Sequence, residues 1–172
     1  DDDNNGFIDD INGWDFIGGK DGKDIEQEQL ESVRVYKSLL EKFGENPSKR
    51  TKKKNKADLA LMSKLKSEID AKKSEATQYL PMYKGMLEKI TQAEEILQKA
   101  TGKSSLTKED VQLIDDQNVE RNVRAAKQVW LNLNAMGATK VDIQDGVTHF
   151  EEELNYNLNE NFDPRKIIGD DL

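Results

Sequence analysis

The feature that most constrains the fold is a row of apolar residues that recurs at every seventh position through the middle of the chain. This row runs from Met62 to Leu97, and a second row follows three residues behind it. Such spacing places all members on one stripe of a helix, and a stripe this long predicts a long helix that packs on its neighbours at a shallow angle. The first row is Met62, Ile69, Ala76, Tyr83, Ile90 and Leu97, and the second is Leu65, Tyr79, Met86, Ala93 and Ala100.

Pro81 lies inside this apolar row. A proline in a helix interior removes one backbone hydrogen bond and usually bends or breaks the helix. The apolar spacing keeps its phase across Pro81, so the sequence predicts a kinked helix, or two nearly collinear helices, rather than a reversal of the chain. Gly102 is expected to end this segment.

Shorter amphipathic helices are predicted on both sides of the long one. One begins near Ile25 and ends at Gly44, a short one is capped by Ser105 or Thr107, a third ends at Gly137, and the last runs from about Thr139 to Leu158. Charged residues and apolar residues each make up 35% of the chain, a balance that favours long solvated helices over a β fold. We therefore expect an all-α fold, an antiparallel bundle of four to five helices with short extended segments at both termini.

A polar connector is predicted between the first helix and the long one. It carries six basic residues between Lys49 and Lys56 and has no interleaved aromatic residue. We interpret it as a solvated loop in preference to a phosphate or nucleic-acid site, because the whole chain has a net charge of −8. That charge also argues against general nucleic-acid binding and against an anionic membrane surface. No apolar run is long enough for a membrane span, and no signal peptide is recognised.

The helical part of the sequence indicates no chemistry of its own. The absence of cysteine excludes disulfides, thiolate zinc sites and cysteine nucleophiles. His149, the single histidine, stands in HFEEE, which is not a zinc-protease signature, and we expect it on a helix surface. Trp130 and Tyr83 are expected in the core. Carboxylate pairs such as Asp115 and Asp116 occur on every helix, so they are not informative.

The first residues, DDDNNGFIDDIN, fit a calcium loop. Acidic and amide side chains alternate around Gly6, which permits a sharp turn, and oxygen ligands in such an arrangement suit Ca²⁺. Asn12 stands where an EF-hand needs a glutamate, so this is not an EF-hand. The alternative is an acidic, solvated turn, since Asp and Asn favour tight backbone conformations. The candidate ligands are Asp1, Asp3, Asn5, the Phe7 carbonyl, and Asp9 or Asp10.

The two ends of the chain resemble segments of subtilisin-like serine peptidases, the subtilases of peptidase family S8. NGFIDD at residues 5–10 and GWDF at residues 13–16 are similar to the acidic element and strand that follow the catalytic aspartate in that family. NFDPRKIIGDD at residues 161–171 resembles the stretch that precedes the His-Gly-Thr-His motif in a group of exported bacterial members. The resemblance covers about 40 residues in all.

The resemblance implies that residues 25–158 are a helical insertion domain within a peptidase core. Residues 1–24 and 159–172 would then belong to that core, with the catalytic Asp upstream of Asp1 and the catalytic His downstream of Leu172. The chain alone would be inactive, and its parent would be an exported serine endopeptidase that hydrolyses peptide bonds. Its partners would be the rest of the catalytic domain and the parent's protein or peptide substrates. The family often binds calcium near its acidic loop, which supports the Ca²⁺ prediction.

An insertion must return to the place where it left its host, so we expect residues 14–17 and 166–168 to lie close together, at the same pole of the bundle. Two other interpretations stay open from the sequence. One is a stand-alone calcium-dependent protein-interaction module, and the other is an oligomeric coiled coil built on the heptad row.

Overall fold

The computed structural model describes residues 25–164, and within them the chain is an all-α helical bundle without a strand. This confirms the predicted fold class. The elements are α1 (Glu31–Phe43), α2 (Lys49–Lys54), α3 (Lys56–Thr101), α4 (Lys108–Gln112), α5 (Arg121–Ala135), α6 (Lys140–Glu152) and a π-helical turn, η1 (Glu153–Asn157).

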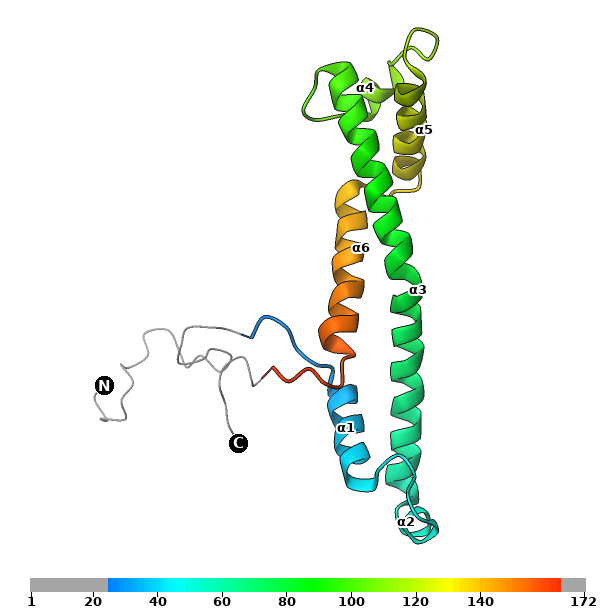
Figure 1. Cartoon of the computed structure of the whole chain (residues 1–172), viewed down its shortest axis with the longest axis vertical. Coiled ribbons are helices and arrows are strands. Elements are labelled where there is room, and N and C mark those ends of the chain that lie inside the picture. Colours follow the sequence, from blue (N-terminus) through cyan, green and yellow to red (C-terminus); the bar gives the residue numbers. More distant parts are fainter. Residues whose placement is uncertain (1–24, 165–172) are drawn as a thin grey trace, which may run out of the picture.

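Helix α3 is the spine of the molecule. It has 46 residues, which corresponds to a length of about 69 Å. Helices α1, α5 and α6 run antiparallel to it; α1 and α6 follow one another along one side of the spine, and α5 lies beside its C-terminal part (Figure 1). No helix among the described residues is long and apolar enough to cross a membrane.

The long helix continues through Pro81, as its apolar row predicts. Figure 1 shows the lower part of α3 upright and its upper part inclined. Helix α6 lies on one side of α3, and α5 lies on the other. Most members of the first row are buried, although Ala100, at the end of the second row, is exposed. The fully buried members include Ile69, Ala76, Ile90 and Leu97, each at most 2% exposed.

The apolar residues gather in two clusters along the spine. The upper cluster joins the C-terminal half of α3 to α4, α5 and α6, and is centred on Ile90, Leu97 and Trp130. The lower cluster joins α1 to the N-terminal half of α3 and consists of Val33, Tyr36, Ile69 and Leu158, with Leu30, Leu40, Met62 and Leu65 packed around them.

Local sequence signals set the helix ends. Gly44, Gly102 and Gly137 follow helices at positive φ, a conformation that other residues rarely adopt, so the three predicted stops are confirmed. Thr107 and Thr139 each begin a helix with a capping box, in which the Thr side chain and an Asp three residues later satisfy one another's backbone N–H groups.

Three boundaries differ from the sequence prediction. The first helix begins at Glu31 instead of near Ile25, because residues 25–30 are not helical and bond to a distant part of the chain. The predicted connector contains α2, whose first turn is capped by the Ser48 hydroxyl accepting from the Thr51 N–H at 3.2 Å. The last helix changes to π geometry after Glu152.

Candidate functional site

The predicted calcium ligands lie outside the described residues. Asp1, Asp3, Asn5, Phe7, Asp9 and Asp10 all precede residue 25, so the calcium site stays a prediction. Within residues 25–164, no three His, Asp or Glu side chains converge so as to hold a metal ion.

The histidine and the two aromatic residues for which the sequence predicted structural roles occupy ordinary structural positions. The side chain of His149 is 64% exposed, lies 3.9 Å from Glu153 and tilts against the Phe150 ring. Trp130 is buried in the upper cluster, as predicted. Tyr83 is half-buried, and its ring meets that of Phe150 edge-on, with 5.4 Å between ring centroids.

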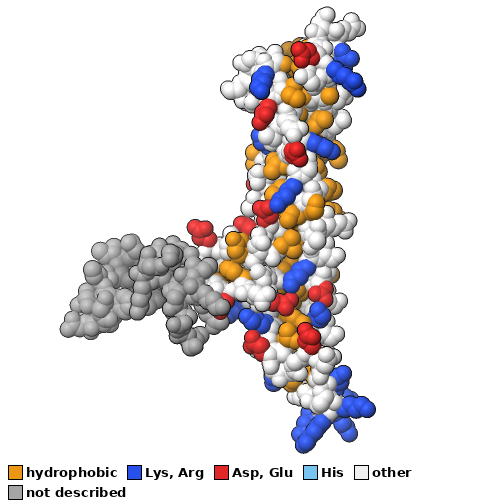
Figure 2. Space-filling view, in the orientation of Figure 1, with side chains coloured by type: hydrophobic (Ala, Val, Ile, Leu, Met, Phe, Trp, Pro, Cys, Tyr) orange, Lys and Arg blue, Asp and Glu red, His pale blue; other side chains and the backbone are white. Residues whose placement is uncertain are grey.

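The basic run forms the tip of the molecule. Its six cations lie on α2 and at the start of α3. In Figure 2, blue side chains gather at the lower end of the elongated helical body, which we call the rod. The sequence prediction of a solvated loop is therefore corrected in one respect, because the segment is solvated but helical.

The most distinctive polar arrangement joins the two ends of the helical body. The Leu30 N–H donates to the Asn157 carbonyl at 2.9 Å, and the Gln29 amide donates to the Asn159 carbonyl at 2.5 Å. Gln29 is only 9% exposed, so this hydrogen bond is shielded from water. We call this region, formed by residues 25–30 and 157–164, the junction.

Side-chain contacts extend the junction to two helices. Gln27 donates to Glu152 of α6 at 3.0 Å, and Lys73 of α3 pairs with Glu160 at 2.9 Å. Phe162 packs edge-on against Tyr156, with 5.0 Å between ring centroids. Both ends of the helical body are thus fixed to its flank by polar and apolar contacts.

The π-helical turn supplies the geometry of the junction. It widens the end of α6, and the Leu158 N–H returns to the Glu153 carbonyl at 2.8 Å. Leu158 is fully buried in the lower cluster. This anchor places the Asn157 and Asn159 carbonyls where residues 29 and 30 reach them.

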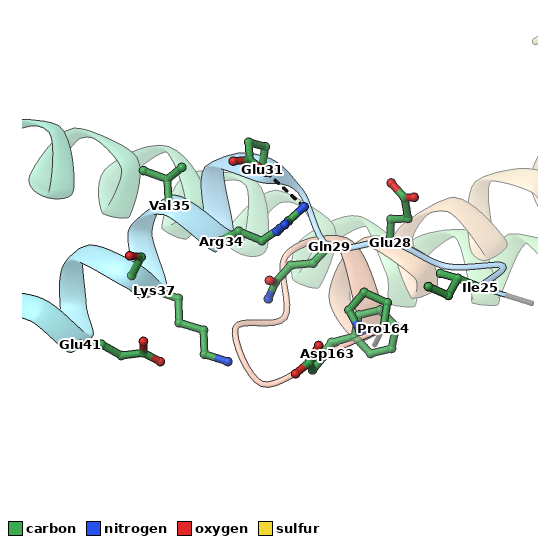
Figure 3. Close-up of a pocket in the computed structure, with 12 residues that line it drawn as sticks. Ile25, Glu28, Gln29, Glu31, Arg34, Val35, Lys37, Glu41, Asp163 and Pro164 are labelled. Atoms are coloured by element: carbon green, nitrogen blue, oxygen red, sulfur yellow. Dashed lines mark ion pairs between the residues drawn. The ribbon is translucent and has the colours of Figure 1, made fainter. Parts of the chain in front are cut away.

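A groove of about 610 Å³ opens beside the junction (Figure 3). Its lining combines Ile25, Glu28 and Gln29 and the exposed side of α1 with Phe162, Asp163 and Pro164. It includes both Arg34 and Glu31, which pair at 3.3 Å. Ser38 also lines the groove, and no histidine is among its described lining residues. The groove is a feature of the junction.

The predicted proximity of residues 14–17 and 166–168 stays a prediction, because both segments lie outside the described part of the chain. The described residues nearest to them, 25–30 and 157–164, leave the helical body together. They leave from its flank, between the end of α6 and the start of α1, and not from a pole (Figure 1). The reason is that α1 and α6 are placed in tandem beside one long helix.

Sequence reasoning missed Lys127. This lysine is 7% exposed, and its ammonium donates to the carbonyls of Gln112 (3.3 Å) and Ile114 (2.7 Å) and to the Asp116 carboxylate (3.0 Å). It closes the end of α4, where backbone carbonyls lack helical partners. A signal was available, since Lys127 lies four residues after Val123 on the apolar face of α5.

No protein-family model matches this chain, and neither a curated protein nor a solved structure was found to be similar to it. What the chain does must therefore be inferred from its own geometry and from the sequence of its two ends.

Proposed function

We propose that the described residues form a non-catalytic helical insertion domain of a larger protein. The observation that carries this proposal is the junction, where a backbone hydrogen bond of 2.9 Å between Leu30 and Asn157 holds the entrance and the exit of the body together. A domain inserted between two neighbouring strands must enter and leave at one place. Termini of single domains are often close together. Here the entrance and the exit are also hydrogen-bonded to each other through their backbones, beside a buried glutamine, and this fixes their relative position.

The proposed host is a subtilisin-like serine endopeptidase. The support is the resemblance of residues 5–16 and 161–171 to the segments that flank the stretch between the catalytic Asp and His in that family. In this proposal the host is exported, its catalytic domain is the first partner of the helical body, and the triad residues lie in the host.

The proposed role is structural or regulatory. Because the junction lies on the flank, the rod extends from it in two directions (Figure 1). A body of this length next to a catalytic cleft can limit which protein substrates reach the cleft, or restrain maturation of the enzyme. Small peptides pass such an obstacle more easily than folded proteins do.

The test is to replace residues 31–157 of the parent enzyme with a short Gly/Ser linker. The Leu30 N–H and the Asn157 carbonyl are 2.9 Å apart, so a few residues bridge the gap without strain. We expect the shortened enzyme to fold and to hydrolyse a small peptide at close to the parental rate, while its cleavage of protein substrates or its maturation changes. The control keeps the helical body and adds the same linker at each end, which disturbs the host loop equally.

Three results would contradict the proposal. A shortened enzyme that cannot fold, while the control folds, would show that the helical body is part of the host core. Unchanged processing and protein cleavage would exclude a regulatory role. Coding sequence on either side that lacks the aspartate strand or the His-Gly-Thr-His motif would exclude a subtilase host.

A further inference from the structure

The tip of the rod carries a concentrated positive charge. Residues 45–58 contain six basic and two acidic side chains, whereas the whole chain has a net charge of −8. Of the two acids, Asp58 is already paired with Lys42 at 3.2 Å. Among the ion pairs between described residues, none involves one of the six cations of the tip. Their side chains are exposed to solvent, so their charge is available to a ligand.

The positive charges of the tip destabilise the short helix α2 that carries most of them. Lys49 and Lys53, like Arg50 and Lys54, are four residues apart on α2, and like charges at this spacing repel. The first turn of α2 contains no acid, although the positive end of a helix dipole favours acids there. An external partner with negative charge would relieve both penalties.

The acids further along α3 lie too far from the tip to neutralise its charge. After Asp58, the next acid along α3 is Glu68, ten residues further on and thus about 15 Å along the helix. Salt screens exposed charges beyond about 8 Å at physiological ionic strength. The tip therefore acts on nearby ligands as a local cation cluster, and the net charge of the chain does not describe it.

From this placement we propose that the tip formed by α2 and the start of α3 docks on an anionic phospholipid surface. The cluster is five lysines and one arginine, and lysine binds phosphate as a mobile point charge, without the fixed two-point geometry of arginine. Clusters of four to eight such residues are attracted to anionic lipid headgroups. Helix α2, KRTKKK, has no apolar residue, so the contact is peripheral and does not enter the hydrocarbon.

The shape and composition of the tip favour a flat surface over a nucleic acid. A planar membrane meets the end of the rod, where the six cations lie, whereas a long polyanion would lie along the flank, where acidic and basic side chains are mixed. The tip also lacks aromatic side chains on which bases stack. Binding to lipid headgroups requires neither aromatic stacking nor a groove in the protein.

The test measures sedimentation of the 172-residue chain with vesicles of equal parts phosphatidylcholine and phosphatidylserine, and with vesicles of phosphatidylcholine alone. The tip variant is Lys52→Gln, Lys53→Gln and Lys54→Gln. The control variant is Lys72→Gln, Lys89→Gln and Lys99→Gln, which makes the same charge change at exposed positions along α3. Glutamine is a good helix former, and circular dichroism verifies that both variants remain folded.

We expect the chain to bind the mixed vesicles and not the neutral ones, with binding that weakens as salt is raised. The tip variant should bind about a hundredfold more weakly, because each cation near an anionic surface contributes about fivefold. The control variant should bind like the original chain. Equal weakening of both variants, or no preference for mixed vesicles, would overturn the proposal. Tighter binding of duplex DNA than of mixed vesicles at the same salt, lost in the tip variant, would overturn it in favour of a nucleic-acid site.

Discussion

At the scale of single residues, a close contact between α6 and α3 depends on Gly146. A Cβ atom at this position would lie 2.2 Å from Cε1 of Tyr83, far inside van der Waals contact. The Tyr83 ring cannot move away easily, because it packs edge-on against Phe150 of α6. The missing side chain of Gly146 therefore lets α6 lie against α3 beside Tyr83, which packs against the upper cluster.

We predict that Gly146→Ala lowers the free energy of unfolding by about 1–3 kcal/mol, the usual cost of overpacking, even though alanine is the better helix former. Gly85→Ala is the matched control. Gly85 is also a helical glycine, but nothing lies within 4 Å of the added Cβ, so its replacement should stabilise the protein by about 1 kcal/mol. Urea denaturation measures the free energy of unfolding of both variants. Stabilisation by both substitutions would show that Tyr83 repacks freely.

At the scale of helices, the two capping boxes couple stability to pH. The pKa of Asp110 is lowered, first by its bond with Lys103 and then by the Thr107 backbone N–H. The pKa of Asp142 is lowered by the Thr139 hydroxyl and backbone N–H. A carboxyl with a lowered pKa in the folded state stabilises the fold above its ordinary pKa of 3.8, and this stabilisation is lost as the pH falls through the lower, folded value.

We therefore predict that the double variant Asp110→Asn and Asp142→Asn is less stable than the original chain at neutral pH. The difference should shrink as the pH falls below the ordinary Asp range, because the original carboxyls then become protonated. Thermal denaturation across this range measures the effect. Asp145→Asn is the control, since Asp145 is on α6 but is not part of its described cap, which consists of Thr139 and Asp142. A difference that stays constant with pH would contradict the role of the charged caps.

The helices show which features sequence could predict. The heptad row, the glycine stops and the Thr107 cap depend on neighbouring residues, and each was predictable. The non-helical form of residues 25–30 was not, because it depends on bonds from Leu30 and Gln29 to carbonyls about 130 positions away. Helix α2 was missed since it has no apolar face to produce a period. The junction, which is central to the proposed function, was predictable only as a return of the chain and not as a place on the flank.

At the scale of the whole molecule, the two apolar clusters differ in size. The upper cluster contains eight buried residues and the lower one four. Since burial of apolar surface is the main stabilising contribution, the lower part of the rod should open more readily than the upper part. The lower cluster also includes Leu158, so its opening and the opening of the junction are one event.

We predict that Leu158→Ala lowers the free energy of unfolding by about 2–5 kcal/mol, the usual range for truncating a fully buried leucine. The loss of stability should be confined to the lower part of the rod. Hydrogen exchange should accelerate at the amides of α1 and at Leu30, whose N–H bonds to Asn157, while the amides of α5 keep their protection because the upper cluster is intact. Leu113→Ala is the control, since Leu113 is 83% exposed and its truncation should change neither region. Equal acceleration in α1 and α5 would mean that the rod unfolds as one unit. Acceleration confined to the lower part would mean that the entrance and exit can separate while the upper part of the rod stays folded, which is what a movable insertion requires.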